Sequence, residues 1–366
     1  MPSATHCVMT KTGGFVSGLL AAVALVGFVS IGATPVSAGA STVAATTSSS
    51  VAPDPSSACS QTHTAQAESA TQSTLSFSAG GKTGTYIQAV PSTAGQVNPF
   101  PLVVDLHGYV EPASFQDLGT QLSAFGQSHG FVTITPQLTE SGVARWDVSA
   151  HSPDIAWLGK LLTHVEGSLC VDQRRVFVTG LSMGAFASSA AACELSSRVA
   201  AVAPVAGLQA FSWCRPTRPV PVVAFQGTAD PFVSYNGGPG PNALKLPAPD
   251  GSNKTVGQEL KTHPHAAGNP LPQSIPTQVA TWAKRNGCGA KPTKTQVASD
   301  VTRVSYPCAA DASVQFYVIK GGGHTWPGGP PGVFPVATVG KTTASISANQ
   351  IIWNFFQTHP LRGRIG

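Results

Sequence analysis

Short apolar runs that alternate with helical patterns constrain the fold of this 366-residue chain more than any other feature of its sequence. The runs are rich in β-branched residues and lie at residues 101–106, 131–135, 176–179, 199–205, 220–225 and 314–319. Helical patterns lie at residues 114–128, 154–166, 183–195, 277–285 and 347–356. Because the strands lack a clean polar face, we predict an α/β fold whose mostly parallel central sheet is covered by helices on both faces. A hairpin at residues 74–90 is expected to add antiparallel strands at one edge.

The composition argues against two other classes of protein. Hydrophobic residues make up 42% of the chain and charged residues only 10%, so the chain can bury a sizeable core and is not wholly disordered. The formal net charge of +5 comes from Lys and Arg residues that are scattered along the sequence. Nucleic-acid-binding surfaces concentrate such residues, so no nucleic-acid partner is predicted.

The N-terminal segment, residues 1–38, is predicted to be a secretory signal peptide. Lys11 precedes an apolar stretch at residues 14–33, and small residues lead up to Ala38, after which cleavage is expected. An uncleaved membrane anchor is the alternative, because the apolar stretch is just long enough to span a bilayer. Residues 39–58 are rich in Ser, Thr and Ala and are predicted to be a flexible spacer before a folded domain at residues 59–366. We therefore expect a secreted protein without stable membrane insertion after signal removal.

Six cysteines remain if Cys7 is removed with the signal peptide, and an even number fits an oxidising compartment. The sequence does not choose among the many pairings that six cysteines allow. Our working pairing joins cysteines that are close in sequence and then the remaining two: Cys193–Cys214, Cys288–Cys308 and Cys59–Cys170. The sequence contains no Cys-x-x-Cys or His-x-x-x-His pattern, so no metal site is predicted.

A Gly-x-Ser-x-Gly motif carries the strongest chemical signal. Residues 180–184 (Gly-Leu-Ser-Met-Gly) directly follow the strand candidate at residues 176–179 and precede a helical pattern. In this context the motif is typical of a sharp turn that lifts the serine above the sheet, next to a helix N-terminus. An ordinary tight turn is the alternative, because Gly and Ser are common residues. The flanking strand and helix favour Ser182 as a nucleophile.

A serine hydroxyl needs a base to activate it and an acid to orient that base. Asp230 lies just beyond the strand candidate at residues 220–225, although an Asp before a Pro is also a common turn former. His324 follows the last strand candidate inside a Gly-rich turn, residues 321–329. The order serine, acid, histidine is the one found in α/β-hydrolases. We predict Asp230 as the acid and His324 as the base.

An oxyanion intermediate requires two fixed N–H donors. The first is predicted to be the backbone N–H of Met183, the residue after the nucleophile. The second should come from an early strand-to-helix loop, where the sequence Leu106-His107-Gly108-Tyr109 occurs. We predict the backbone N–H of Tyr109 as this donor, and we expect His107 to brace the loop.

Four segments together resemble one protein family. They are residues 106–109, 170–185, 201–207 and 321–328, the last reading Gly-Gly-Gly-His-Thr-Trp-Pro-Gly. The chain resembles the secreted polyhydroxybutyrate-depolymerase-like and feruloyl-esterase-like branch of the α/β-hydrolases. The resemblance implies the α/β-hydrolase fold and hydrolysis of carboxylic esters through an acyl-enzyme, without a cofactor. The implied substrates are hydroxyalkanoate oligomers, feruloyl esters or similar carbohydrate esters.

The same resemblance implies that Trp146 and Trp326 line the substrate pocket, although either could instead pack in the core. Residues 236–276 form a long insertion rich in Gly and Pro, which is interpreted as either a lid over the site or an inert surface insertion. Three other functions use similar sequence features. They are acyl transfer of the mycolyl-transfer type, peptide hydrolysis of the prolyl-oligopeptidase type, and polymer or cell-wall binding without catalysis.

Overall fold

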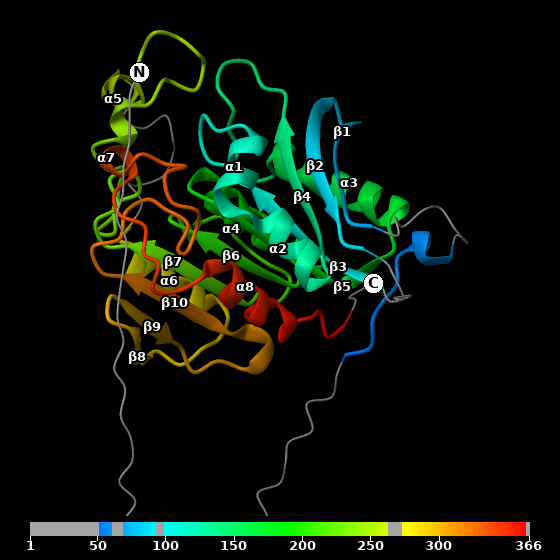
Figure 1. Ribbon diagram of the computed structural model, residues 1–366. Helices are drawn as coiled ribbons and strands as arrows, with labels where there is room; N and C mark the ends of the chain where they lie inside the picture. Colours follow the sequence, from blue (N-terminus) through cyan, green and yellow to red (C-terminus); the bar gives the residue numbers. More distant parts are fainter. Residues whose placement is uncertain (1–50, 61–68, 93–98, 263–272, 364–366) are drawn as a thin grey trace, which may run out of the picture. The chain divides into compact units, whose positions relative to one another are not determined.

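A ten-stranded sheet lies at the centre of the described part of the chain, a computed structural model of residues 51–60, 69–92, 99–262 and 273–363 (Figure 1). The signal peptide predicted at residues 1–38 and the first part of the predicted spacer, residues 39–50, lie outside these ranges. The strands are β1 (Thr71–Ala79), β2 (Lys82–Val90), β3 (Phe100–Leu106), β4 (Val132–Leu138), β5 (Val171–Leu181), β6 (Ala201–Val205), β7 (Val222–Gly227), β8 (Thr293–Ala298), β9 (Val301–Ser305) and β10 (Val314–Ile319).

The strand order confirms the predicted architecture. Neighbours in the sheet follow the order β1-β2-β4-β3-β5-β6-β7-β10-β9-β8. The strands from β4 to β10 in this order are parallel to one another, whereas β1 and β2 at one edge and β9 and β8 at the other are antiparallel. The expected hairpin forms at Gly80 and Gly81, which both have positive φ angles. The sheet is therefore mostly parallel and has antiparallel strands at both edges.

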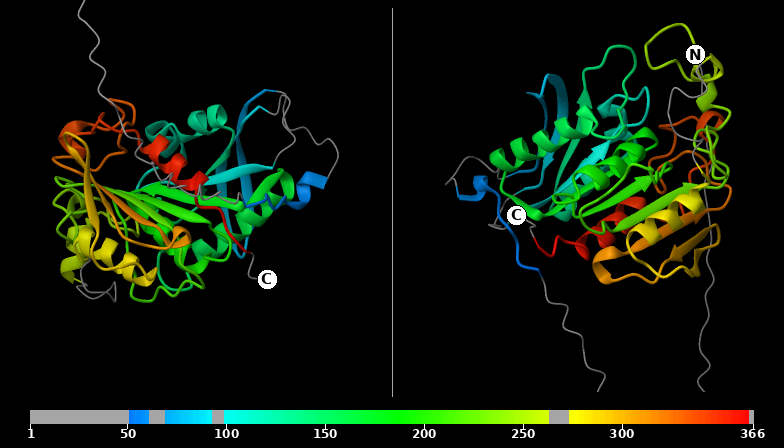
Figure 2. Two further views of the ribbon diagram at one scale, coloured as in Figure 1. Left: turned by 90° about the horizontal axis from the view of Figure 1, so that it is seen from below. Right: turned by 180° about the vertical axis from the view of Figure 1, so that it is seen from behind.

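Helices cover both faces of the sheet. They are α1 (Ala113–Thr120), α2 (Leu122–His129), α3 (Pro153–Ser168), α4 (Met183–Glu194), α5 (Val256–Thr262), α6 (Ile275–Arg285), α7 (Val336–Val339) and α8 (Ala348–Gln357), with short 3-10 helices at Ser57–Ser60, Ala243–Lys245 and Ala310–Ala312. Helices α1, α2 and α8 lie on one face, and α3, α4 and α6 lie on the other (Figure 2). Within the described ranges, no helix combines the length and apolar character needed to cross a membrane.

Successive residues of a central strand enter two different hydrophobic cores, because side chains alternate across a sheet. In β3, Leu102 and Val104 belong to the core that contains residues of α3, α4 and α6, whereas Val103 belongs to the core that contains residues of α8. All three side chains are buried. Burying one such side chain contributes roughly 1.5–3 kcal/mol. This two-sided burial explains why the strand lacks a polar face.

Two elements differ from the expectation based on sequence. The helix expected at residues 114–128 is divided into α1 and α2 at Gln121, which has a left-handed φ of 52° and donates its backbone N–H to the carbonyl of Asp117. The β8–β9 hairpin was not expected, because β8 is largely polar and exposed and therefore has no apolar run. Exposed edge strands of this kind carry little hydrophobic signal.

The first described residues pack against the sheet, although they belong to the segment predicted to be a flexible spacer (residues 39–58). The N–H of Ser56 donates to the carbonyl of Val171 at 2.9 Å, and the N–H of Gln173 donates to the carbonyl of Asp54 at 2.9 Å. These bonds attach the segment to the start of β5. The folded body therefore begins earlier than predicted.

The structure contains the three disulfides of the working pairing, which is thereby confirmed. They are Cys59–Cys170, Cys193–Cys214 and Cys288–Cys308. The first spans 111 residues, so on the chain-entropy model it stabilises the fold by about 5 kcal/mol. It also fixes the N-terminal segment next to β5. Disulfides of this kind are typical of proteins that fold outside the reducing cytosol.

Candidate active site

Ser182 lies on a strained turn between β5 and α4, as the Gly-x-Ser-x-Gly motif predicts. Its φ of 61° and ψ of −119° fall in a region that L-residues rarely adopt, at a typical cost of about 1–3 kcal/mol. The backbone N–H of Ser182 donates to the carbonyl of Val205 at the end of β6 at 3.0 Å. The turn is thus held against the neighbouring strand while the serine side chain faces a pocket.

The two glycines of the motif are required by close packing against β3. A Cβ atom on Gly184 would lie 1.8 Å from the carbonyl oxygen of Leu106, and one on Gly180 would lie 2.5 Å from the same atom. Any larger residue would push the turn away from the end of β3. This contact brings the serine turn next to the loop that follows β3, which carries the predicted oxyanion donor.

His324 and Asp230 form a buried hydrogen-bonded pair. His324 Nδ1 and Asp230 Oδ2 are 2.8 Å apart. Asp230 Oδ1 accepts the backbone N–H groups of Phe232 and Val233 at 2.8 and 2.9 Å, and Oδ2 also accepts the side-chain amide of Gln226 at 2.8 Å. Burial lowers the pKa of His324, but the Asp230 carboxylate more than offsets this, so the pKa is raised overall. Asp230 is therefore held in place and orients the imidazole.

The loop that carries His324 packs tightly against its neighbours. The N–H of His324 donates to the carbonyl of Val339 at 2.6 Å. A Cβ atom on Gly323 would lie 2.1 Å from the same carbonyl oxygen, and one on Gly227 would lie 2.2 Å from the carbonyl oxygen of Gly322. The glycines before His324 allow this loop to approach both the end of β7 and α7, which fixes the histidine backbone.

Ser182 and His324 lie at the same site but are not hydrogen-bonded to each other among the described residues. The ring of Phe232 contacts the imidazole with a centroid distance of 4.9 Å, and Phe232 also lines the pocket that Ser182 faces. In substrate-free enzymes, catalytic hydrogen bonds often tighten only when a ligand binds. The structure thus pairs His324 with Asp230, and Phe232 connects this pair to the pocket that Ser182 faces.

The two predicted oxyanion donors lie beside Ser182, Tyr109 in the loop after β3 and Met183 at the start of α4. A Cβ atom on Gly108 would lie 3.4 Å from Cβ of Ser182. Within the described residues, the backbone N–H groups of Tyr109 and Met183 have no hydrogen-bond acceptor. Tyr109 and Met183 also line the pocket together with Ser182. Both donors are thus available at the serine.

Glu111 is a site residue that the sequence-based reasoning missed. Its Oε2 accepts the backbone N–H of Gly108 at 3.0 Å. Burial raises the pKa of Glu111, while the charge of His324 and the Gly108 N–H oppose the rise. Glu111 thus holds the loop that carries Tyr109, and its carboxylate interacts electrostatically with His324. The sequence carries no motif that would have identified it.

His107 braces the same loop, as expected. It is buried, and its Nδ1 lies 2.7 Å from the carbonyl oxygen of Gly108. Burial lowers the pKa of His107 to about 4, although the bond to Gly108 opposes the shift. The ring is therefore neutral at ordinary pH and donates from Nδ1. The indole N–H of Trp146 adds a bond to the His107 carbonyl at 3.0 Å.

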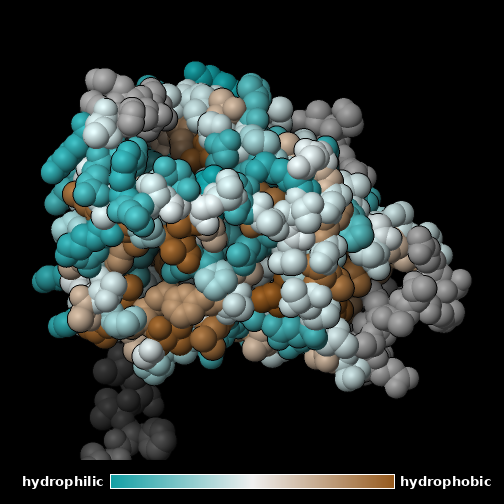
Figure 3. All heavy atoms as spheres, turned by 90° about the horizontal axis from the view of Figure 1, so that it is seen from above, coloured by the Kyte–Doolittle hydropathy of each residue, from teal (hydrophilic) through white to brown (hydrophobic). Residues whose placement is uncertain are grey.

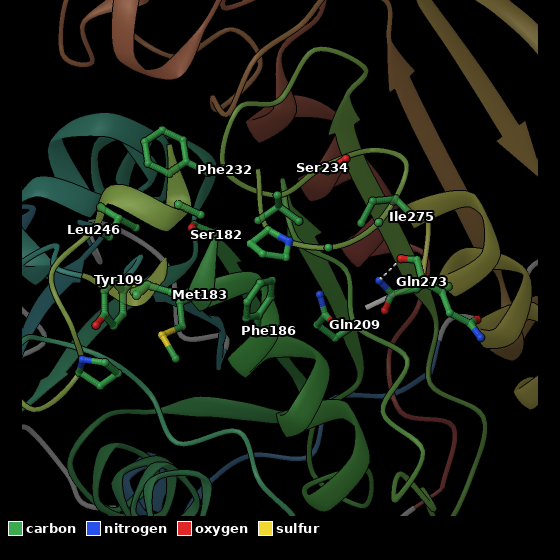
Figure 4. A pocket seen from close by; sticks show the side chains of 18 residues that line it. Tyr109, Ser182, Met183, Phe186, Gln209, Phe232, Ser234, Leu246, Gln273 and Ile275 are labelled. Carbon is green, nitrogen blue, oxygen red and sulfur yellow. Dashed lines mark hydrogen bonds between the residues drawn. The ribbon is translucent and has the colours of Figure 1, made fainter. Parts of the chain in front are cut away.

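Ser182 opens into a mainly apolar pocket of about 280 Å³ (Figure 4). The pocket is lined by Tyr109, Ser182, Met183, Phe186, Gln209, Phe232, Val233, Ser234, Gly237, Gly238, Pro239, Ala243, Leu246, Pro249, Val256, Gln273, Ile275 and Gln278. Tyr109 and Leu246 lie on one side of Ser182 in this view, and Gln209, Gln273 and Ile275 lie on the other. A bound ligand could therefore extend to both sides of the nucleophile.

Neither tryptophan predicted to line the pocket does so. Trp146 is 1% exposed and donates its indole N–H to the carbonyl of His107. Trp326 is 2% exposed and donates its indole N–H to Oδ1 of Asn349 at 2.8 Å. Both indoles lie in the core, with their N–H groups satisfied internally. The aromatic lining comes instead from Tyr109, Phe186 and Phe232.

The described residues contain no cluster of His, Cys, Asp or Glu side chains that could hold a metal ion. The pocket instead presents a serine and two backbone donors, and the histidine–carboxylate pair lies behind the pocket residue Phe232. This set can activate a hydroxyl group and stabilise a negatively charged oxygen, which are the requirements of acyl transfer.

No protein-family profile matches the chain, but individual proteins do. Feruloyl esterase B of Piromyces equi is 26% identical over 234 residues, which make up 61% of this chain and 39% of that protein. Poly(3-hydroxyalkanoate) depolymerase C of Paucimonas lemoignei is 30% identical over 115 residues, which make up 29% of this chain and 28% of that protein. The chain thus spans less than half the length of both relatives.

Among solved structures, the acetyl xylan esterase from Aspergillus awamori superposes with a TM-score of 0.50 at 14% identity. The match covers 78% of this chain and 99% of that structure, and at this identity it bears on the fold alone. Together with the mostly parallel sheet and its two helical layers, it confirms the predicted fold. The chain has the α/β-hydrolase fold and is similar in sequence to proteins named feruloyl esterase and poly(3-hydroxyalkanoate) depolymerase.

Proposed function

We propose that this protein is a serine carboxylic ester hydrolase with Ser182, Asp230 and His324 as its catalytic triad. The observation that carries the proposal is a strained serine at an apolar pocket with two unpaired backbone donors, next to a buried histidine–aspartate pair whose imidazole contacts the pocket residue Phe232. The similarity to named esterases supports it. Labelling of Ser182 by a fluorophosphonate, together with the Ser182→Ala variant, tests it.

In the proposed reaction Ser182 Oγ attacks the ester carbonyl carbon while its proton passes to His324 Nε2. Asp230 holds the Nδ1–H and stabilises the imidazolium that forms. The backbone N–H groups of Tyr109 and Met183 bind the oxyanion. The intermediate then collapses, and the alcohol leaves with the proton from His324. Water then attacks the acyl-enzyme while His324 takes its proton. His324 returns the proton to Ser182 Oγ as the acid leaves, so no cofactor is required.

The proposed substrates are small or oligomeric esters, namely hydroxyalkanoate oligomers, feruloyl esters or similar carbohydrate esters. The names of the relatives support this range. A pocket of about 280 Å³ lies at the lower end of the sizes that hold small ligands, so it fits one acyl group rather than a long polymer segment. Acyl transfer to an alcohol would appear as a transesterified product in the same assay.

We also propose that the protein is exported, with residues 1–38 removed as a signal peptide. The three disulfides support this, because such bonds persist mainly in oxidising compartments. The mass of the exported protein gives the cleavage position directly.

The insertion at residues 236–276 is proposed to act as the roof of the pocket. Its described part contributes several lining residues, including Leu246 and Val256, and the Tyr109 hydroxyl donates to the Pro247 carbonyl at 2.8 Å. The roof thereby contacts the loop that carries the oxyanion donor. Figure 3 views the molecule from the side of α5, where apolar atoms show in patches between polar ones.

Replacing Leu246 with alanine is expected to lower kcat/KM for an octyl acetate-type ester by about tenfold, with a much smaller change for a methyl acetate-type ester. Leu246 lies on the Tyr109 side of Ser182, so only a long alcohol group would contact the missing side chain, and each lost methylene contact weakens binding. Leu118→Ala, in an exposed side chain of α1, is the matched control. Equal losses on both esters would contradict a role for the roof in recognition of the alcohol group.

Replacing Glu111 with glutamine is expected to move the acidic limb of the kcat/KM profile to lower pH. The Glu111 carboxylate helps to raise the pKa of His324, and hydrolysis needs the neutral imidazole, so activity rises with pH through this pKa. Removing the charge lowers the pKa and keeps the base active in more acidic solution. Glutamine retains an oxygen that can accept the Gly108 N–H, so the loop should stay in place.

The measurement is kcat/KM against pH for wild type, Glu111→Gln and the control Glu140→Gln, whose carboxylate pairs with Lys82. The control should retain the wild-type profile. A Glu111→Gln profile with an unmoved acidic limb would show that Glu111 acts only as a structural support of the loop.

A further inference from the structure

Besides the groups at Ser182, the apolar pocket contains a buried side-chain amide nitrogen without a partner among the described residues. The side chain of Gln209 lines the pocket and is 8% exposed. Its Nε2 is fully buried and makes no hydrogen bond to any described residue. Burying an amide N–H without an acceptor typically costs about 1–3 kcal/mol. A donor left in this state inside a binding pocket is well suited to an acceptor on a ligand.

The backbone of Gln209 is fixed, so the amide has a defined place. Its N–H donates to Ser189 Oγ at 3.2 Å, and its carbonyl accepts the indole N–H of Trp282 at 2.8 Å. Ser189 is in α4, seven residues beyond Ser182, which places it about 10 Å farther along the helix. Gln209 is therefore anchored against α4, and its side chain is separated from Ser182 by Phe186 in Figure 4.

The neighbouring amide at this end of the pocket is already used. Gln278 accepts the N–H of Ala210 at 2.8 Å through Oε1 and donates to the carbonyl of Gln273 at 3.0 Å through Nε2. It thus supports the pocket wall, and both of its polar atoms already have a protein partner. In Figure 4, Gln209 lies beside Phe186, on the side of Ser182 opposite to Tyr109.

We propose that Gln209 selects esters whose apolar acyl group carries a hydrogen-bond acceptor at its far end. This inference rests on the proposed ester hydrolysis at Ser182 and adds the chemistry of the acyl group. The acceptor is an ether, phenol or carbonyl oxygen that receives the Nε2–H of Gln209, and the apolar body packs between Phe186, Phe232 and Ile275. An aryl group that carries an oxygen substituent and an aliphatic chain with an internal oxygen share this chemistry.

The test compares esters that differ only in the distal oxygen. The aryl pair is the methyl esters of para-methoxyphenylpropanoic and para-ethylphenylpropanoic acid, which have matched shapes and differ by an oxygen in place of a methylene. The aliphatic pair is methyl octanoate and its analogue with one distal methylene replaced by an ether oxygen. We expect the wild-type protein to prefer the oxygen-containing member of at least one pair by about tenfold in kcat/KM. The pair for which the protein shows this preference tells whether the acceptor belongs to an aryl or to an aliphatic acyl group.

The Gln209→Leu variant should lose this preference, because leucine fills a similar volume without a donor. Gln357→Leu makes the same chemical change at an exposed residue of α8 outside the pocket and should retain the wild-type ratio. Thermal unfolding of both variants checks their folding. The ratio within a pair is insensitive to the fraction of active protein, so partial misfolding does not imitate the expected result.

Three outcomes would overturn the inference. Wild-type ratios near one for both pairs, with methyl acetate still hydrolysed, would reject the role of Gln209 and leave the proposed function intact. A preference that survives in Gln209→Leu would assign the recognition to another group. Hydrolysis of no ester at all, together with no labelling of Ser182, would reject the proposed function and this inference with it.

Discussion

Replacing Ser182 with alanine is expected to lower kcat for ester hydrolysis by about 10⁶-fold, because losing the nucleophile removes the whole acyl-enzyme route. The fold should survive, since the strain at this residue lies in its backbone and its side chain makes no hydrogen bond among the described residues. Alanine has a smaller side chain than serine, so it adds no steric strain at this positive φ angle. The loss of activity should therefore reflect chemistry and not unfolding.

Intact-mass spectrometry after fluorophosphonate treatment measures this directly. The wild-type protein should gain one adduct on Ser182, and the variant should gain none. Ser188→Ala is a matched control in the same helix, because the Ser188 hydroxyl bonds only to the carbonyl of Ala185. The mass before treatment also gives the position of signal cleavage. A Ser182→Ala protein that retains most of its activity would refute the assignment, and a folded wild type without an adduct would favour a binding function.

Replacing Asp230 with asparagine is expected to lower kcat by about 10⁴-fold. Asparagine Oδ1 can still accept the N–H groups of Phe232 and Val233, so the side chain should keep its place. Its Nδ2 would then face His324 Nδ1 as a donor. The imidazole would respond by accepting at Nδ1 and carrying its proton on Nε2, where it cannot receive the proton of Ser182.

The measurement is kcat at a pH where the wild-type rate no longer changes, with Asp311→Asn as an exposed control. Because the Asp230 carboxylate raises the pKa of His324, its loss should also move the acidic limb of the remaining activity to lower pH. A loss smaller than about tenfold would mean that another group orients His324, since the wrong tautomer alone accounts for the larger effect.

Local patterns were enough to propose the candidate site residues, because each of them depends on a short segment. The turn at Ser182 needs small residues at positions 180 and 184, and the packing of both against the Leu106 carbonyl shows why. Asp230 and His324 each follow a strand directly, and parallel strands bring their carboxyl ends to one edge of the sheet. A single sequence therefore contained enough to place the three residues at one site.

Predictions failed where a residue's role depends on contacts between distant segments. Trp146 and Trp326 have the size and chemistry of pocket residues, yet both donate to internal acceptors and lie in the core. The β8 strand has no apolar run and forms by pairing with β9. The helix expected at residues 114–128 is divided at Gln121, whose left-handed conformation no local pattern required.

The sequence by itself determined the alternation of strands and helices, the serine turn and the order of the proposed triad residues, because these features follow from residue periodicity and from glycines at fixed offsets. Only the tertiary structure showed that Glu111 supports the loop after β3 and interacts electrostatically with His324, and that the described part of the insertion at residues 236–276 contributes to the pocket wall. Only the structure placed Gln209 in that pocket with its amide unpartnered. Whether a buried polar group has a partner depends on which distant segments pack around it, and no local pattern in the chain specifies that.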